Sequence, residues 1–456
     1  MDISKLIEQQ RKFFYTHKTF DLHYRMIMLQ KLKQTIQAYE PQIHAALKAD
    51  LGKSETEAYM CETGMTLSEL SYQLKHIRRF ASQRRVRTGL ANFHARSFTV
   101  PEPYGCVLIM SPWNYPFMLC MEPLIGAIAA GNCCVLKPSA YSPATSAVIK
   151  QLISDVFPPA YVSVVEGGRA ENNELLNQRF DYIFFTGGVT VGKLVMEKAS
   201  THLTPVTLEL GGKSPCIIDK TCNLKIAASR LAFGKYLNCG QTCVAPDYVL
   251  IDRSIKDKFL PLLTEAITQM YGQDPLNNPD YGKIINRKHF DRINGLIDKS
   301  KVILGGNSNV KTLQIAPTVL DNVTAKDAVM QEEIFGPVLP ILTYDSIEDA
   351  EAFICSREKP LALYLFTQNK ETERKFLQYV PFGGGCINDT IIHLATSEMG
   401  FGGVGQSGMG SYHGKKSFDT FSHEKSIVKK YCWPDLPMRY QPYQKFYFQL
   451  IRMFLH

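Results

Sequence analysis

Long apolar runs are missing from this chain of 456 residues. No stretch of about 18 uncharged apolar residues occurs, so the sequence predicts no membrane-spanning helix. The first residues, Met1 to Lys5, also lack the apolar core of a secretory signal, and we therefore expect a cytoplasmic protein. In that compartment the 12 cysteines are expected to be reduced thiols. They form no CxxC pair and no zinc-like spacing with histidine, so no metal site is predicted.

A strong excess of one charge is also missing. The formal net charge is +8, and one basic cluster stands out at Arg78, Arg79, Arg84, Arg85 and Arg87. Such a cluster could bind a polyanion, or it could be a solvated helix end followed by a linker. No nucleic-acid-binding motif accompanies it, so we favour the solvated helix end and expect no nucleic-acid partner. With 45% hydrophobic and 21% charged residues, the composition is that of a globular protein.

The apolar pattern predicts an α/β fold with two sheets. Residues 1–80 are expected to be helical, and 88–103 to form an extended excursion. From 107 to 185, short apolar runs alternate with helical stretches, which is typical of a parallel sheet covered on both faces. A second series of this kind runs from 206 to 387, so we place a domain boundary near Glu209. The glycine-rich stretch 399–414 is expected to be a loop.

A glycine turn follows the apolar run Tyr182–Phe185. It spans residues 186–194 and precedes a helical stretch. Backbone N–H groups at such a helix start can hold a phosphate, although the same turn also joins strands to helices without any ligand. Leu194 stands where a P-loop carries a hydroxyl, so a nucleoside triphosphatase is not expected. A formal GxGxxG at 403–408 lacks a preceding strand and a following helix, and we do not interpret it as a dinucleotide fingerprint.

Three polar side chains lie where apolar segments are predicted to end. Lys137 follows an apolar strand, so its ammonium either meets a ribose or phosphate oxygen or extends to solvent. Glu209 ends an alternating strand and could act as a general base or pair with Lys213. Cys243 follows a helix predicted to end near Asn238. Most cysteines are buried and inert, so this segment alone does not establish a nucleophile.

Seven segments together are more informative than each alone. They are Pro112-Trp113-Asn114-Tyr115-Pro116, Leu136-Lys137-Pro138-Ser139, Phe185-Thr186-Gly187 with Gly192, Leu208-Glu209-Leu210-Gly211-Gly212-Lys213, Asn238-Cys239-Gly240-Gln241-Thr242-Cys243, Glu333-Ile334-Phe335-Gly336-Pro337 and Phe401-Gly402-Gly403-Val404-Gly405-Gln406-Ser407-Gly408. In this order they resemble the aldehyde dehydrogenase superfamily, and most closely its class 3 branch, over roughly residues 1–430.

The resemblance implies a division of the chain. A Rossmann-like cofactor domain would comprise 1–80 and 104–208, and an α/β catalytic domain 209–395. Bridging or oligomerisation segments would comprise 81–103 and 396–430, followed by a C-terminal tail at 431–456. Class 3 members are typically dimers, so a homodimer is expected.

The resemblance also implies roles for individual residues. Cys243 would be the nucleophile, Asn114 and the Cys243 backbone N–H would hold the oxyanion, and Glu209 would activate water. NAD or NADP, or both, would be bound by Lys137, Ser139, Thr186, Gly187, Gly192, Glu333 and Phe335. Glu333 is a second candidate base, so the choice between it and Glu209 stays open. The implied substrate funnel comprises Tyr115, Met118, Leu119, Phe233, Thr242 and Ile392.

These assignments predict oxidation of apolar aldehydes, either aliphatic of medium or long chain or aromatic, to carboxylic acids. Two alternatives are an acylating dehydrogenase that uses coenzyme A and a structural relative without catalysis. Retention of Glu209 favours hydrolysis, and the joint presence of Cys243 and Asn114 opposes a silent relative. Ala140 stands where many relatives carry a glutamate, which predicts that NADP is accepted as well as NAD.

The tail is apolar from Phe446 to His456 and follows three prolines. At 11 residues it is about half as long as a bilayer-spanning helix needs to be. We expect it to dock on its own subunit or on the dimer partner, in preference to a weak membrane-surface contact through 446–456, because its polar face has little basic charge.

Overall fold

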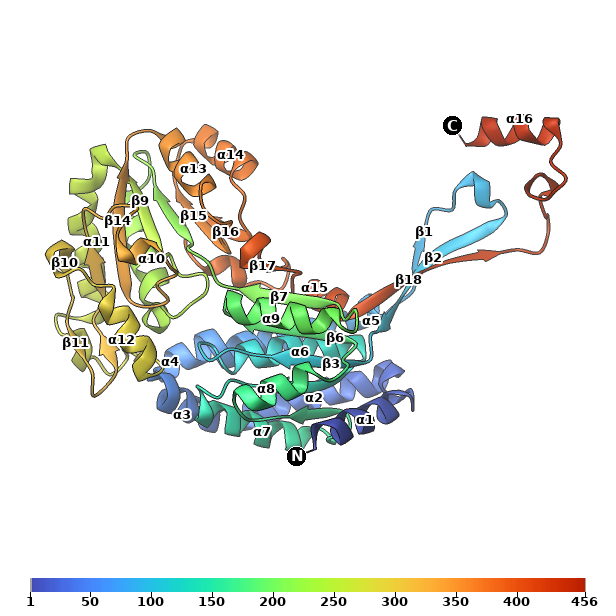
Figure 1. The fold of residues 1–456 in the computed structure, drawn as a ribbon, viewed down its shortest axis with the longest axis horizontal. Helices are drawn as coiled ribbons and strands as arrows, with labels where there is room; N and C mark the ends of the chain where they lie inside the picture. Colours follow the sequence, from blue (N-terminus) through green and yellow to red (C-terminus); the bar gives the residue numbers. More distant parts are fainter. Residues whose placement is uncertain (1, 456) are drawn as a thin grey trace.

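The computed structural model describes residues 2–455 and consists of two α/β units and a projecting arm (Figure 1). The first unit contains a six-stranded sheet in the order β17-β7-β6-β3-β4-β5. Five of its strands are parallel, as predicted, and β17 pairs antiparallel with β7. The strands are β3 Cys106–Met110, β4 Cys133–Lys137, β5 Val162–Val164, β6 Tyr182–Gly187, β7 Val206–Leu210 and β17 Gly408–Met409.

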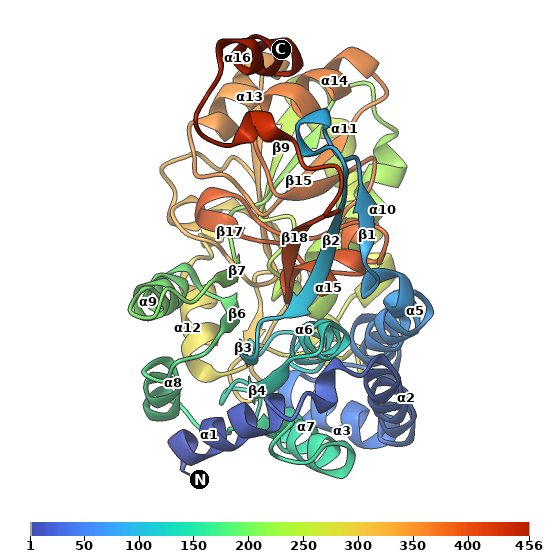
Figure 2. The same ribbon diagram turned by 90° about the vertical axis from the view of Figure 1, so that its right-hand side faces the viewer.

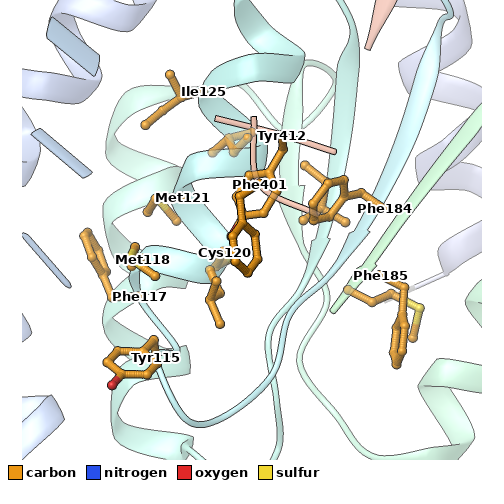
Figure 3. Close-up of a cluster of buried hydrophobic side chains, with 14 of the residues drawn as sticks. Tyr115, Phe117, Met118, Cys120, Met121, Ile125, Phe184, Phe185, Phe401 and Tyr412 are labelled. Atoms are coloured by element: carbon orange, nitrogen blue, oxygen red, sulfur yellow. The ribbon is translucent and has the colours of Figure 1, made fainter. Parts of the chain in front are cut away.

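Helices cover this sheet on both faces, as its uninterrupted apolar strands require. Helix α6 lies against the strands, and all of its residues are buried, so it is apolar on every side except for Glu122. Figure 3 shows Cys120 and Met121 of this helix, with Phe117 just before it, in one cluster with Phe184 of β6. The helices of this unit are α1 Ile3–Phe14, α2 Leu22–Ala38, α3 Glu40–Leu51, α4 Glu55–Ala58, α5 Gly64–Phe80, α6 Met118–Ala130, α7 Pro143–Val156, α8 Arg169–Leu176 and α9 Val189–Ser200.

The second unit contains a seven-stranded sheet in the order β10-β13-β14-β9-β8-β15-β16, in which only β10 is antiparallel. Its strands are β8 Pro215–Ile218, β9 Tyr248–Asp252, β10 Val302–Leu304, β13 Thr318–Leu320, β14 Val338–Tyr344, β15 Ala362–Phe366 and β16 Gly384–Ile387. Its helices are α10 Leu224–Tyr236, α11 Lys256–Tyr271, α12 Arg287–Gly295, α13 Ile347–Cys355 and α14 Lys370–Tyr379. A short hairpin, β11 Ser308–Asn309 with β12 Gln314–Ile315, lies outside this sheet.

The expected boundary near Glu209 is wrong by a few residues. Glu209 lies inside β7, a strand of the first sheet, and the second sheet begins at Pro215. The segment 396–430 also does more than bridge, because Gly408 of β17 pairs with Glu209 of β7. The physical reason is that the glycine-rich stretch can approach the edge strand closely: a side chain at Gly408 would meet the Leu208 carbonyl oxygen.

The arm is a three-stranded antiparallel sheet that leaves the body (Figures 1 and 2). It contains β1 Arg84–Val86, β2 Ala95–Pro103 and β18 Ser422–Lys430, and it confirms the extended excursion predicted at 88–103. Of the basic cluster, Arg78 and Arg79 end α5, whereas Arg84 and Arg85 are strand residues and not a linker. Arg84 pairs with Glu424 across the arm.

The tail ends in helix α16, Lys445–Phe454, which lies near the far end of the arm (Figure 1). Helix α15, Lys415–Thr420, packs on α6 at the base of the arm. Over residues 2–455 no helix combines the length and the apolar character that a bilayer crossing demands.

Candidate active site

The chain segment that carries Cys243 is a tight, strained turn after α10. Asn238 and Cys239 have φ of 52° and 53°, and Gly240 follows with φ of 71°. Only glycine fits at position 240, because a side chain there would meet the Gly336 carbonyl oxygen. The Gln241 side chain ties the turn to the neighbouring loop by donating to Lys283 O at 3.0 Å and accepting from Ile285 N at 3.0 Å. The turn therefore presents Cys243 from a rigid frame.

Cys243 is partly exposed to a cavity of about 170 Å³. All six residues predicted for the substrate funnel line this cavity, from the start of α6, from α10 and from the segment after β16. The sequence analysis missed several further members, which are also mostly apolar. They are Met60, Cys61, Met65, Leu237, Ile391, Leu394, Ala395, Phe401, Tyr412 and His413.

Asn114 lies buried beside the Cys243 turn. Its side-chain amide donates to Gln241 O at 3.0 Å. Its main-chain carbonyl oxygen accepts from the Asn238 side chain at 2.8 Å. The next residue, Tyr115, bonds through its hydroxyl to the Thr242 hydroxyl at 2.6 Å. An amide nitrogen carries two N–H donors, so Asn114 can serve a second acceptor.

Glu209 is buried, and neither of its carboxylate oxygens has a hydrogen-bond partner in the described part of the chain. Burial raises the pKa of Glu209 well above its usual range. The alternative that Glu209 pairs with Lys213 is wrong, because Lys213 instead bonds Asp247 at 2.5 Å. A carboxyl group that is buried without a partner is suited to exchange protons with a reacting molecule.

Burial, together with the nearby carboxylates of Glu333 and Glu209, raises the pKa of the Cys243 thiol to about 12. Burial, with Asp247 nearby, also raises the pKa of Glu333, to about 8. Both acids thus lie close enough to influence the thiol. The chain alone holds the thiol protonated at neutral pH, so the thiolate forms only when a base accepts its proton or a positive charge approaches.

A second depression, of about 730 Å³, lies between the two units at the carboxyl ends of β6 and β7. Ligands of open parallel sheets bind at this position. The first unit contributes Val189 and 211–213 to its walls, and the second contributes 331–333 and 356–360. We call it the cleft.

The cleft fits a dinucleotide in three respects. Helix α9 begins at Val189 beside it, so free backbone N–H groups are available to a diphosphate. The Thr186 hydroxyl on the adjoining strand end is buried without a partner among residues 2–455. Glu333 folds against Gly211, where a side chain would collide with its carboxylate, and so lies at the wall as a hydroxyl acceptor.

Other predicted cofactor residues lie around this sheet edge. Lys137 ends β4 and donates to Gly167 O at 2.7 Å and Pro138 O at 2.9 Å. Ser139 follows it in a turn, where its hydroxyl accepts from Tyr141 N. Phe335 has φ of 49°, and its ring centroid is 5.3 Å from that of Trp113.

Gly192 differs from the expected diphosphate contact. It lies one turn inside α9, buried, and a side chain there would come within 2.7 Å of Leu210. Its lack of a side chain therefore lets α9 pack closely on β7. Gly187 lies at the end of β6, and its role at the diphosphate stays a prediction.

The chain belongs to the aldehyde dehydrogenase family, whose model matches residues 1–427. A 4,4'-diaponeurosporen-aldehyde dehydrogenase of Staphylococcus aureus is 48% identical over 96% of this chain and 97% of its own. A dimeric NADP-preferring aldehyde dehydrogenase of Canis lupus familiaris is 44% identical over 96% and 98%. Relatives named as members of aldehyde dehydrogenase family 3, at 44 and 45% identity, confirm the class 3 resemblance.

The fold is confirmed in the same way. A structure described as the substrate-bound state of Staphylococcus aureus AldH superposes with a TM-score of 0.98, at 46% identity and over 100% of both chains. The chain is therefore an aldehyde dehydrogenase with the mixed α/β fold of that family.

Proposed function

We propose that this protein oxidises apolar aldehydes to carboxylic acids with NAD or NADP, through a thioester on Cys243. The observation that carries the proposal is the position of Cys243. Its thiol lies in the wall of a mostly apolar cavity, on the turn that also bonds the Asn114 amide, and the carboxylate of Glu209 influences it.

The proposed first step needs a base. Glu209 and Glu333 both have raised pKa values, which makes each a stronger base, so either can accept the thiol proton in its ionised form. The thiolate then attacks the carbonyl carbon and forms a thiohemiacetal. The Asn114 amide and the Cys243 backbone N–H hold the oxyanion in a site that excludes bulk water.

In the second step the thiohemiacetal loses a hydride and becomes a thioester on Cys243. The dinucleotide, when bound in the cleft, supplies the hydride acceptor. Glu209 then takes a proton from a water molecule, whose oxygen attacks the thioester carbonyl; the C–S bond breaks, and the acid and the Cys243 thiolate are released. We assign this base role to Glu209 because its oxygens are unpartnered, and Glu333 to the cofactor ribose because it lies at the cleft wall.

The substrate proposal is an apolar aldehyde of medium or long chain, or an aromatic one. The cavity walls are almost entirely apolar. No arginine lines them that could bind the carboxylate of a semialdehyde substrate. The Staphylococcus aureus relative is named for 4,4'-diaponeurosporen-aldehyde, which points in the same direction.

The test is a kinetic panel of hexanal, decanal, benzaldehyde and succinic semialdehyde, each with and without coenzyme A. We expect reduced cofactor with the first three aldehydes, decanal or benzaldehyde having the highest kcat/KM, and no dependence on coenzyme A. A requirement for coenzyme A would replace the proposal by the acylating reaction, and no turnover would leave a structural role.

We also propose a homodimer, with the arm as its contact. The edge strand β18 is exposed along its length, including Ile427 and Val428, and the relative from Canis lupus familiaris is named as dimeric. In α16, Ile451 and Leu455 line a hollow with the loop Leu90–Phe93.

Three further apolar side chains of α16, Phe446, Phe448 and Met453, are exposed, which is unfavourable in water. We propose that the partner subunit covers them in preference to a membrane surface. Truncation after Tyr443 should then weaken the dimer. Lost vesicle co-sedimentation with an unchanged dimer and unchanged kinetics would contradict this.

A further inference from the structure

A buried ion pair lies in the first unit, between Lys53 in the loop from α3 to α4 and Glu62 in the helical turn that follows α4, and both residues precede every catalytic motif in the sequence. Lys53 Nζ is 2.5 Å from Glu62 Oε1, and the two side chains are 1% and 0% exposed. Removing both charges from water is costly, and such a pair is seldom kept for stability alone. Its contacts indicate what else it does.

Both members of the pair reach the segment that begins at Asn114. Lys53 donates to Asn114 O at 3.1 Å, and its ammonium lies 4.0 Å from the centre of the Tyr115 ring. The other oxygen of Glu62 accepts from Phe117 N at 3.1 Å and from Met118 N at 2.9 Å. Phe117 and Met118 form the start of α6, whose first N–H groups have no partner within the helix.

The local fold explains how Glu62 reaches this position. Residues Tyr59–Thr63 form a π-helical turn between α4 and α5, with one extra residue per turn. The turn points Glu62 inward, while Met60 and Cys61 line the substrate cavity. Figure 3 shows Tyr115, Phe117 and Met118 along the chain that enters α6.

Among residues 2–455 the nitrogen of the Asn114 side-chain amide donates one hydrogen bond, to Gln241 O. Its position therefore depends on its own backbone, which Lys53 and the Asn238 side chain fix at the carbonyl oxygen. We propose that Lys53 and Glu62 are positioning residues, which hold the 114–118 backbone so that the Asn114 amide meets the oxyanion. This inference rests on the oxyanion role given to Asn114 in the proposed function.

A double-mutant cycle in the full-length protein tests the coupling. Lys53→Met removes the ammonium and keeps most of the side-chain volume, and Asn114→Ala removes the amide. We expect Lys53→Met to lower kcat roughly 10- to 100-fold, as a misplaced oxyanion donor would. In the Asn114→Ala background the same change should lower kcat less than about threefold, because the donor is already absent. The dissociation constant of the dinucleotide should stay unchanged throughout.

The matched control is Lys256→Met, which removes another largely buried ion pair, to Asp321 at 3.0 Å on the second unit. It should leave kcat unchanged. Glu62→Gln is the second variant if Lys53→Met does not fold. It keeps an oxygen that can accept from both backbone N–H groups and removes the oxygen that faces Lys53, so it should show a smaller fall in kcat with the same dependence on Asn114.

An equal effect of Lys53→Met in both backgrounds, or none in the native background, would overturn the inference. Crystal structures of the same variants separate this result from a failure of the proposed function. If the native chain oxidises no aldehyde, the proposed function is wrong, and the position of the Asn114 amide in Lys53→Met still decides the positioning role. An unmoved amide would refute it, and a displaced one would support it.

Discussion

The walls of the cavity beside Cys243 are formed by apolar side chains, whereas those of the cleft beside Glu333 are formed largely by backbone and charged groups. The cavity is enclosed by side chains, such as Met118, Phe233 and Ile392, that come from separate segments of the chain. The cleft depends on backbone and charge, with Gly211, Gly212 and Lys213 on one wall and Glu333 on the other. The difference indicates that cavity substitutions change which aldehyde reacts, whereas cleft substitutions change which dinucleotide binds.

The largest expected effect separates the two sites. Cys243→Ala should lower turnover on the order of 10⁴-fold, because only the thiol forms the covalent bond. Dinucleotide binding in the cleft should stay measurable by titration. Cys61→Ala is the matched control, since Cys61 lines the same cavity, and it should retain activity. Comparable turnover of the Cys243→Ala variant would contradict the mechanism.

The second effect concerns the base. Glu209→Gln should slow thioester hydrolysis roughly 100-fold and affect hydride loss less. Stopped-flow mixing with decanal should then show a burst of reduced cofactor followed by a slow steady state. If Glu333→Gln gives this trace and Glu209→Gln loses its burst, the two roles must be exchanged.

How far the sequence predicted the molecule differs between the same two sites. Candidates such as Glu209 and the glycine turn after β6 could be singled out, because strand-end charges and glycine turns are local signals. The parallel strands and the helix before Cys243 were predictable from periodicity for the same reason. Cavity members such as Met60 and Met65 gave no signal, since an apolar residue on a helix looks the same whether it packs in the core or lines a pocket.

Contacts between segments that are far apart in the sequence could not be predicted either. Nothing local shows that Lys53 and Glu62 contact the segment after Asn114, or that β17 returns to pair with β7. Gly192 gives a related case: its place beside a glycine turn predicts a ligand contact, and nothing local shows that a side chain there would meet Leu210.

A smaller effect should appear in the pH dependence of stability. The pKa of Glu333 is raised from its ordinary value to about 8, so the folded chain binds this proton more tightly than the unfolded chain. The stabilisation is complete below about pH 4.5 and is lost as pH rises through 8, by at most about 1.4 kcal/mol per pH unit.

The buried histidines His289, His393 and His413 have pKa values lowered to about 4. They make the folded chain more stable as pH rises from about 4, and this gain is complete near pH 6.5. Between pH 6.5 and 8.5 the melting temperature of the native chain should therefore fall more than that of Glu333→Gln. Glu332→Gln, which alters the exposed neighbour, should behave like the native chain. If the melting temperatures of all three proteins change with pH in parallel, ionising Glu333 costs the folded chain no stability, which would contradict the prediction.

The smallest expected effect concerns the choice between NADP and NAD in the cleft. Ala140 is exposed, three residues after Lys137, and carries no charge that would repel a 2′-phosphate. We expect the native protein to use NADP as well as NAD, and Ala140→Glu to raise the KM for NADP roughly tenfold relative to NAD. Ala140→Gln adds the same bulk without the charge and should change the ratio little. A native protein without NADP activity would contradict this.

The account's central claim is that an acyl group passes through Cys243. The most direct test is to mix Glu209→Gln with decanal and NAD or NADP, quench in acid within the burst, and analyse peptides by mass spectrometry. The account predicts a decanoyl thioester on the peptide that contains Cys243, absent when either the aldehyde or the cofactor is omitted. An acyl group on Cys61, or reduced cofactor produced with no acyl group on any cysteine, would contradict it.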